Sequence, residues 1–160
     1  MTELNKTEAL AQSTLGAELD ATECEALAGQ MGVQALKQGE VLVREGEQRR
    51  TLFVLAEGQL NVCKVVGEHE ETVYQMRTGE CAGTRAFIDG STRRAALCAD
   101  TDGTVLTLEP ADFEALIDSH PRVVYKVMRA IFRITHSNLM RMNLESAEMR
   151  NYLMKSGGRY

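Results

Sequence analysis

The sequence contains no long hydrophobic run of the kind found in chains that cross a membrane or are exported. No stretch of about 18 apolar residues occurs, so no segment is apolar enough to span a bilayer as a helix. The N-terminal residues, MTELNKTEALAQS, are polar and lack the apolar core of a secretion signal. We therefore expect a cytoplasmic protein that has no membrane partner.

Motifs for metal binding and for catalysis are also absent. The cysteines include no C-x-x-C pair, and the histidines are dispersed. These residues are Cys24, Cys63, Cys81, Cys98, His69, His120 and His136. We expect reduced, mostly buried thiols and no metal site. Since no G-x-S-x-G, H-E-x-x-H or P-loop pattern occurs either, the sequence favours a protein that is not an enzyme.

The chain has no excess of positive charge. It carries 18 Lys and Arg residues against 23 Asp and Glu residues, which gives a formal net charge of -5. Binding of nucleic acid or of an acidic membrane over the whole surface requires a basic excess, so this balance argues against both. Local basic patches are still compatible with it.

The 160-residue sequence has the pattern of a single domain that is built mainly from strands. A helix is predicted over about residues 21–31, because Asp20 is followed by a glutamate and by alanine and leucine at helical spacing. The chain then breaks into short β-branched runs separated by glycines at positions 39, 46, 58 and 67. Two more strands, RAALCAD and GTVLTLE, are joined by the turn TDG, and PADFEALIDSH follows as a short helix. These elements predict a β-roll of about six to eight strands.

The last part of the chain predicts one long helix. From Pro121, about thirty residues follow without an internal glycine or proline. Within them, residues recur at alternating steps of three and four, which is the pattern of a heptad seam. This seam consists of Tyr125, Met128, Phe132, Thr135, Leu139, Met142, Ser146, Met149 and Leu153. A helix of about 45 Å outruns a small β-roll, so we expect its distal half to pair with a second copy in a homodimer.

A loop rich in glycine and arginine lies between two of the predicted strands. It runs from Gly79 to Asp100, GECAGTRAFIDGSTRRAALCAD, and holds three glycines and three arginines. Exposed backbone amides, guanidinium groups and helix N-termini are the groups with which proteins hold anions. This loop is therefore the candidate for an anion-binding site.

Three segments of the sequence carry a resemblance to a known family. They are KQGEVLVREGE, LFVLAEGQLNV, and AGTRAFIDGSTRRAA followed by ADTDGTVLTLEPADFEAL. By their spacing and glycine placement, over roughly residues 15–145, the chain resembles the cyclic-nucleotide-binding domain family, and within it the effector domains of catabolite-activator-type regulators. The resemblance implies an α+β, mainly β fold. This is an antiparallel β-roll or jelly roll (a double-stranded β-helix) with a short N-terminal helix and a long C-terminal helix.

The resemblance also implies a phosphate-binding cassette, which in the family reads close to FGELAFIDGSPRSAT. In the family an arginine of this cassette pairs with the cyclic phosphate, and a glutamate binds the ribose 2'-hydroxyl. On this chain Gly83 takes the place of the glycine and Arg93 falls on the phosphate-binding arginine. Thr84 stands where the glutamate is expected, with Arg85 beside it. A shifted alignment would give the ribose role to Glu80, but it needs extra loop residues, so we prefer the first register.

The replacement of the glutamate by Thr84 weakens the implied site. A carboxylate that accepts a buried sugar hydroxyl contributes about 1.5–3 kcal/mol, so affinity for a cyclic mononucleotide is expected to fall roughly ten- to a hundredfold. Arg85 and Arg94 next to Arg93 make the loop more cationic, which would suit a ligand with more phosphate charge or a carboxylate-bearing metabolite. Alternatively, Arg94 points to solvent, since neighbouring strand residues face opposite ways.

In activator-type members of the family, polar side chains of the long helix cover the purine base. The corresponding residue here is Asn138, which either reads a base edge or is the single polar residue that fixes the register of a helical dimer. The candidate ligand-binding residues are thus Gly83, Thr84, Arg85, Arg93, Arg94, Ala95 and Asn138. No cofactor is expected other than a cyclic-nucleotide-like ligand.

We expect the chain to divide into four parts. They are an N-terminal extension (1–14), the β-roll (15–120), the long dimerisation and capping helix (121–155) and a tail (156–160). The chain ends at KSGGRY without a helix-turn-helix after the long helix, so direct DNA binding is not expected. Output would then pass through dimer geometry or a partner protein.

Three functional hypotheses follow from these features. The leading one is a free-standing sensor module, in which a small anion orders the loop and biases the orientation of the long helix. The alternative is a degenerate domain without a ligand that serves as a dimerisation or protein-docking module. A third, haem or redox sensing through a cysteine or His69, lacks any ligand spacing in the sequence.

Overall fold

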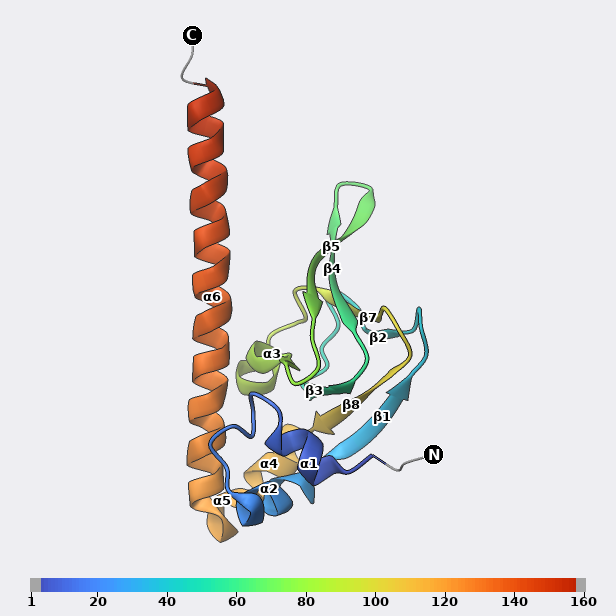
Figure 1. Cartoon of the computed structure of the whole chain (residues 1–160), viewed down its shortest axis with the longest axis vertical. Coiled ribbons are helices and arrows are strands. Elements are labelled where there is room, and N and C mark those ends of the chain that lie inside the picture. Colours follow the sequence, from blue (N-terminus) through green and yellow to red (C-terminus); the bar gives the residue numbers. More distant parts are fainter. Residues whose placement is uncertain (1–3, 158–160) are drawn as a thin grey trace.

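The computed structural model describes residues 4–157, with side chains described up to residue 155 (Figure 1). The helices are α1 (Lys6–Ala11), α2 (Ala21–Ala28), α3 (Thr84–Asp89), α4 (Pro110–Glu114), α5 (Leu116–Ser119) and α6 (Pro121–Gly157). The strands are β1 (Gly32–Leu36), β2 (Val41–Val43), β3 (Leu52–Glu57), β4 (Leu60–Val66), β5 (His69–Met76), β6 (Cys81–Ala82), β7 (Ala96–Ala99) and β8 (Gly103–Leu108).

The strands form two four-stranded antiparallel sheets. The strand order is β1-β8-β3-β6 in the first sheet and β2-β7-β4-β5 in the second. Strands from distant parts of the sequence are neighbours, as where Val33 of β1 lies opposite Leu106 of β8. The predicted fold, an antiparallel β-roll with a short N-terminal helix and a long C-terminal helix, is confirmed, and helix α1 precedes the predicted helix.

The core has two parts. Between the sheets, apolar side chains such as Phe53, Leu60 and Leu97 are almost fully buried. A second cluster lies under the helices and contains Leu10 of α1 and Val127 of α6. Within the expected N-terminal extension, residues 4–14 include helix α1, whose Leu10 is fully buried in the domain.

The short helices differ in detail from their predicted bounds. The Asp20–Glu23 capping box is present, but α2 ends at Ala28, and Met31 packs into the core before β1 begins. The helix predicted from the segment PADFEALIDSH is split in two at Ala115.

Helix α6 is longer than predicted, at 37 residues or about 55 Å. Its first third packs on the domain through buried residues that include Val123, Val127 and Ile131. Its middle part runs beside α3 and the strands, and its last part extends past the β-roll (Figure 1). The predicted boundary to a tail at residue 156 falls inside α6, and residues 158–160 lie outside the described residues. Within residues 4–157, no helix combines the length and apolarity that crossing a membrane requires.

Most residues of the predicted heptad seam are exposed, although Thr135 hydrogen-bonds to Thr84 of α3. Its members Tyr125, Phe132, Leu139 and Met149 are 62%, 70%, 54% and 60% exposed. At about 3.6 residues per turn, Tyr125 lies almost opposite the face that packs on the domain. The seam then drifts around the helix, and Met149 lies in line with Ile131, five turns further along. The exposed seam thus starts apart from the packed face and approaches the line of that face beyond the domain.

Candidate ligand-binding site

The glycine-arginine loop folds around the short helix α3, which lies between β6 and β7. Both ends of α3 are glycines in the left-handed region, Gly83 with φ 87° and Gly90 with φ 73°. A Cβ atom on Gly83 would overlap the guanidinium of Arg93. Glycine is thus required at position 83 both by the backbone conformation and by the close approach of Arg93.

Arg93 is the buried cation of this loop, with 6% of its surface exposed. One end of its guanidinium donates a hydrogen bond to the carbonyl of Thr51, and the group lies 5.4 Å from the centre of the Phe53 ring. The Nε atom is buried and has no hydrogen-bond partner among the described residues. Burial, and then the neighbouring Arg49, lower the pKa of Arg93 from its usual value, but a guanidinium stays charged in proteins.

A cavity of about 370 Å³ opens between α3, the ends of β6 and β7, and helix α6. All seven residues predicted for the site line this one cavity. They are Gly83, Thr84, Arg85, Arg93, Arg94, Ala95 and Asn138. The structure therefore brings together residues that are as far apart in the sequence as β6 and the middle of α6, and their role as ligand contacts stays a prediction.

Thr84, which stands in the place of the family glutamate, is 8% exposed. Its hydroxyl accepts a hydrogen bond from the hydroxyl of Thr135 in α6, with 3.1 Å between the two oxygens. The side chain therefore connects the first turn of α3 to the long helix. This contact was not anticipated from the sequence.

The two outer arginines are more accessible than Arg93. Arg85 forms an exposed ion pair with Asp89 one turn along α3, with 3.7 Å between Nε and Oδ2. Arg94 is exposed to solvent and also lines the cavity, so its role toward a ligand stays a prediction. Asn138 is partly buried and lines the cavity, and it lies outside the exposed seam of α6.

The sequence did not point to Tyr74 or Arg141, and it pointed to Glu80 only through a shifted alignment, but all three line the cavity. Glu80 lines the cavity without the shifted alignment, and its carboxylate accepts two contacts from the Tyr74 hydroxyl, at 2.9 and 2.7 Å. Burial, and then this contact with Glu80, raise the pKa of Tyr74. The guanidinium of Arg141 lies over the Tyr74 ring, 4.0 Å from its centre. The signal for Arg141 was its position one helical turn after Asn138.

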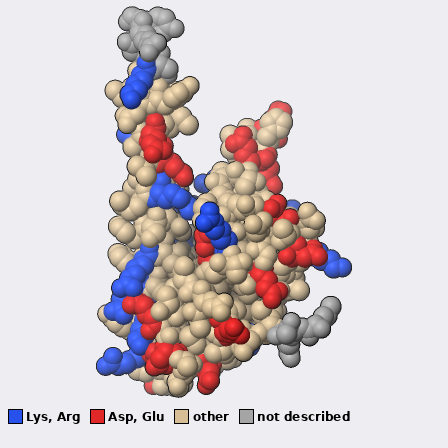
Figure 2. All heavy atoms as spheres, viewed as in Figure 1, with Lys and Arg blue, Asp and Glu red and all other residues tan. Residues whose placement is uncertain are grey.

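Basic side chains gather around this site although the whole chain is acidic. Figure 2 shows Lys and Arg along α6 and in the hollow between α6 and the strands, and Asp and Glu at the tip of the β4–β5 hairpin. Five cationic residues line the cavity against two carboxylates. The cations are Lys64, Arg85, Arg93, Arg94 and Arg141, and the carboxylates are Glu80 and Glu145. The cavity can thus attract and hold an anion.

Comparison with known proteins gives the same picture. Residues 33–120 match the family model described as the cyclic nucleotide-binding domain. The chain is 29% identical, over 91 residues or 57% of its length, to a cyclic nucleotide-gated potassium channel of Rhizobium etli, of which it covers 24%. It spans 27% or less of the length of the first curated relatives that it matches.

Among solved structures, the chain resembles a cyclic nucleotide-binding domain from Methylobacillus flagellatus. The TM-score is 0.76 at 20% identity, over 85% of this chain and 77% of that one. It also resembles the regulatory domain of Toxoplasma gondii PKA with cAMP, with a TM-score of 0.62 at 24% identity, over 69% of this chain and 42% of that one. These structural likenesses show the fold, and the family match covers more than half of the chain. The chain belongs to the cyclic nucleotide-binding domain family, which is regulatory.

Proposed function

We propose that the chain is a regulatory sensor module that binds a small phosphate-bearing ligand of the cyclic-nucleotide type in the cavity of the glycine-arginine loop. The observation that carries the proposal is the buried guanidinium of Arg93. A buried charge is costly unless it is paired, and its Nε has no hydrogen-bond partner among the described residues. A phosphate oxygen in the cavity would pair with this guanidinium in a charge-assisted hydrogen bond.

The charges around Arg93 support an anionic ligand. The excess of cations over carboxylates in the cavity wall favours a ligand that carries at least one phosphate. Thr84 cannot replace the charge of the family glutamate, and its hydroxyl already accepts a hydrogen bond from Thr135. We therefore expect weak binding of a cyclic mononucleotide, and tighter binding of a ligand whose phosphate charge is larger.

The proposed output of the site is the long helix. The cavity wall includes Asn138 and Arg141 of α6, and the Thr84–Thr135 hydrogen bond joins α3 to the same helix. A ligand that prefers one position of α6 by a few kcal/mol would shift the population toward it. We propose that the module forms a homodimer through the exposed seam of α6, and that it acts through this dimer or a partner protein, not as an enzyme.

The test is thermal unfolding of the full chain with and without millimolar cAMP, cGMP and cyclic dinucleotides. A ligand at a hundred times its dissociation constant adds about 2.7 kcal/mol of stability. For a chain of this size, that corresponds to a rise in Tm of roughly 5–10 °C. We expect such a rise for at least one of these ligands and its loss in the variant Arg93→Ala.

The matched control is Arg49→Ala. The Arg49 guanidinium lies on the same Phe53 ring, 5.1 Å from its centre, but Arg49 does not line the cavity. This variant should keep the ligand-dependent rise in Tm. A rise that persists in Arg93→Ala would contradict the proposed site. No rise with any of these ligands would instead support the domain as a dimerisation or docking module without a ligand.

A further inference from the structure

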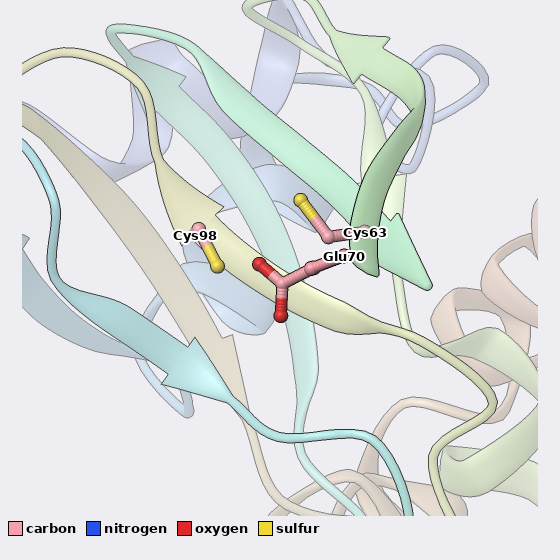
Figure 3. Close-up of side chains that lie close together, drawn as sticks. All are labelled: Cys63, Glu70 and Cys98. Atoms are coloured by element: carbon pink, nitrogen blue, oxygen red, sulfur yellow. The ribbon is translucent and has the colours of Figure 1, made fainter. Parts of the chain in front are cut away.

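Three potential metal ligands meet on the second sheet, away from the cavity of the glycine-arginine loop. They are the Cys63 sulfur from β4, the Cys98 sulfur from β7 and a carboxylate oxygen of Glu70 from β5. All three atoms lie within 4.8 Å of one another, and in Figure 3 the Glu70 carboxylate lies between the two sulfurs. Within the described part of the chain, no other group of three such residues comes this close.

The strand register explains why these three side chains meet. Cys63 lies opposite Ala96, so Cys98, two residues further along β7, is its diagonal neighbour on the same face. Glu70 lies opposite Val65, which shares that face with Cys63. The alternate residues, such as Leu60 and Leu97, point to the core between the sheets. The three ligands thus lie on the outer face of the sheet.

The diagonal placement favours a bridging atom over a direct disulfide bond. Diagonal neighbours in an antiparallel pair have Cα atoms about 7–8 Å apart, beyond the usual range of about 4.4–6.8 Å for a disulfide. Two sulfurs bound to one zinc ion, each at about 2.3 Å in tetrahedral geometry, lie about 3.8 Å apart. A separation within 4.8 Å needs only a small side-chain adjustment to reach that geometry.

We propose that Cys63, Cys98 and Glu70 form a binding site for a thiophilic divalent cation of the zinc type. Two thiolates and a carboxylate match the preference of zinc for sulfur, nitrogen and oxygen ligands in tetrahedral geometry. The protein supplies three ligands, and because Glu70 is exposed, the fourth position is open to water or to an external ligand. The Thr72 hydroxyl lies 3.6 Å from the Cys63 sulfur and would hydrogen-bond to this sulfur without binding the metal itself. This site is independent of the proposed nucleotide-type ligand.

The experiment is an anaerobic titration of the full, phosphine-reduced chain with Co²⁺, followed by Zn²⁺. We expect thiolate-to-cobalt charge-transfer absorption that saturates at one Co²⁺ per chain and is lost when Zn²⁺ displaces the cobalt. Cys63→Ala and Cys98→Ala should each abolish the absorption. Glu70→Gln should weaken Co²⁺ binding by at least about tenfold. Loss of a residue that only hydrogen-bonds to a metal ligand already lowers metal affinity about 10- to 100-fold.

Two matched controls keep the test interpretable. Glu71→Gln changes the next residue of β5, which points to the opposite face. Cys24→Ala removes a buried thiol from the core cluster under the helices. Both should bind Co²⁺ as the unchanged chain does, and so should Arg93→Ala. Because Glu70 is exposed, its variant should fold even if a cysteine variant does not. The proposal is overturned if the folded chain shows no charge-transfer absorption, if the absorption survives Cys98→Ala, or if Glu70→Gln and Glu71→Gln bind equally well.

Discussion

At the scale of single residues, the shape of the cavity depends on the missing side chain at Gly83. The Arg93 guanidinium occupies the space where a Cβ on Gly83 would lie. Gly83 also has a φ of 87°, which L-residues with a side chain rarely adopt. A methyl group at this position would therefore strain the backbone and also displace the Arg93 guanidinium.

The variant Gly83→Ala tests this dependence. We expect a loss of stability of about 1–3 kcal/mol from the left-handed backbone, and in addition a displaced Arg93 that no longer supports the ligand-dependent rise in Tm. Chemical denaturation gives the first quantity, and thermal unfolding with and without ligand gives the second. Gly39→Ala is the matched control, because Gly39 has a φ of 89° but no atom within 4 Å of the added methyl group. If Gly83→Ala keeps the full ligand effect, Arg93 is not held by this contact.

Most of the predicted residues that line the cavity belong to the contiguous loop, such as Gly83 and Arg93, and only Asn138 comes from α6. The loop residues are close together in the sequence, so they stay close together in the fold. The contact between Thr84 and Thr135 and the position of Arg141 over Tyr74 depend on how α6 is rotated against the roll. That rotation is set by tertiary packing of Val127 and Ile131, which periodicity alone does not specify.

At the scale of elements, the exposed seam of α6 makes a prediction about assembly. Leu139 and Met149 are more than half exposed, and such apolar residues at heptad spacing are typical of a helix that pairs with another. The double variant Leu139→Glu with Met149→Glu places like charges in that seam. We expect it to sediment as a folded monomer in analytical ultracentrifugation, whereas the unchanged chain sediments as a dimer.

The control for this test is Met140→Glu, an exposed position outside the seam. This variant should remain dimeric, and an unchanged dimer in the double variant would contradict the assignment of the seam. Truncation after Tyr125 is less informative than these substitutions. It would remove Val127 and Ile131, which belong to the core of the domain.

The elements themselves could largely be predicted, and their pairing could not. Glycines at positions 39, 46, 58 and 67 marked turns, and all four have positive φ. The register between β4 and β7 has no signal in the sequence, because it is set by how the two sheets bury their apolar faces. For this reason Cys63 and Cys98 gave no motif, and the expectation of no metal site rested on sequence spacing alone.

At the scale of the whole molecule, ion pairs tie the N-terminal part to the long helix. Glu18 accepts hydrogen bonds from Arg129, with an Nη2–Oε1 distance of 2.7 Å, and pairs with Arg133. Glu23 accepts one from Lys126, at 2.6 Å. The hydrogen bond from Arg129 lowers the pKa of Glu18, and the hydrogen bond from Lys126 lowers that of Glu23.

These lowered pKa values predict how stability depends on pH. A carboxyl group with a depressed pKa in the folded state stabilises the fold above its ordinary value of 4.5, and this contribution is lost as the pH falls through the folded pKa. We expect the double variant Glu18→Gln with Glu23→Gln to melt below the unchanged chain at pH 7. Because both pairs are near the surface, the effect should be small and should shrink in high salt.

The measurement is Tm against pH for both chains, with Glu68→Gln, at the exposed β4–β5 turn, as the control. The two curves should converge in acid, where the carboxyl groups are protonated in both states. A difference in Tm that stays constant from neutral pH into acid would show that the variant acts through packing and not through these charges.

The length of α6 beyond the cavity also makes the helix a lever. Its part up to Arg141 lies along the domain, and after Arg141 another 16 residues continue to Gly157, a rise of about 24 Å. Each degree of tilt at Arg141 therefore moves the far end by about 0.4 Å, by the geometry of a rigid rod of that length. A tilt of about ten degrees at the cavity would therefore displace the far end of the rod by about 4 Å, which is comparable to the contact distance between packed side chains.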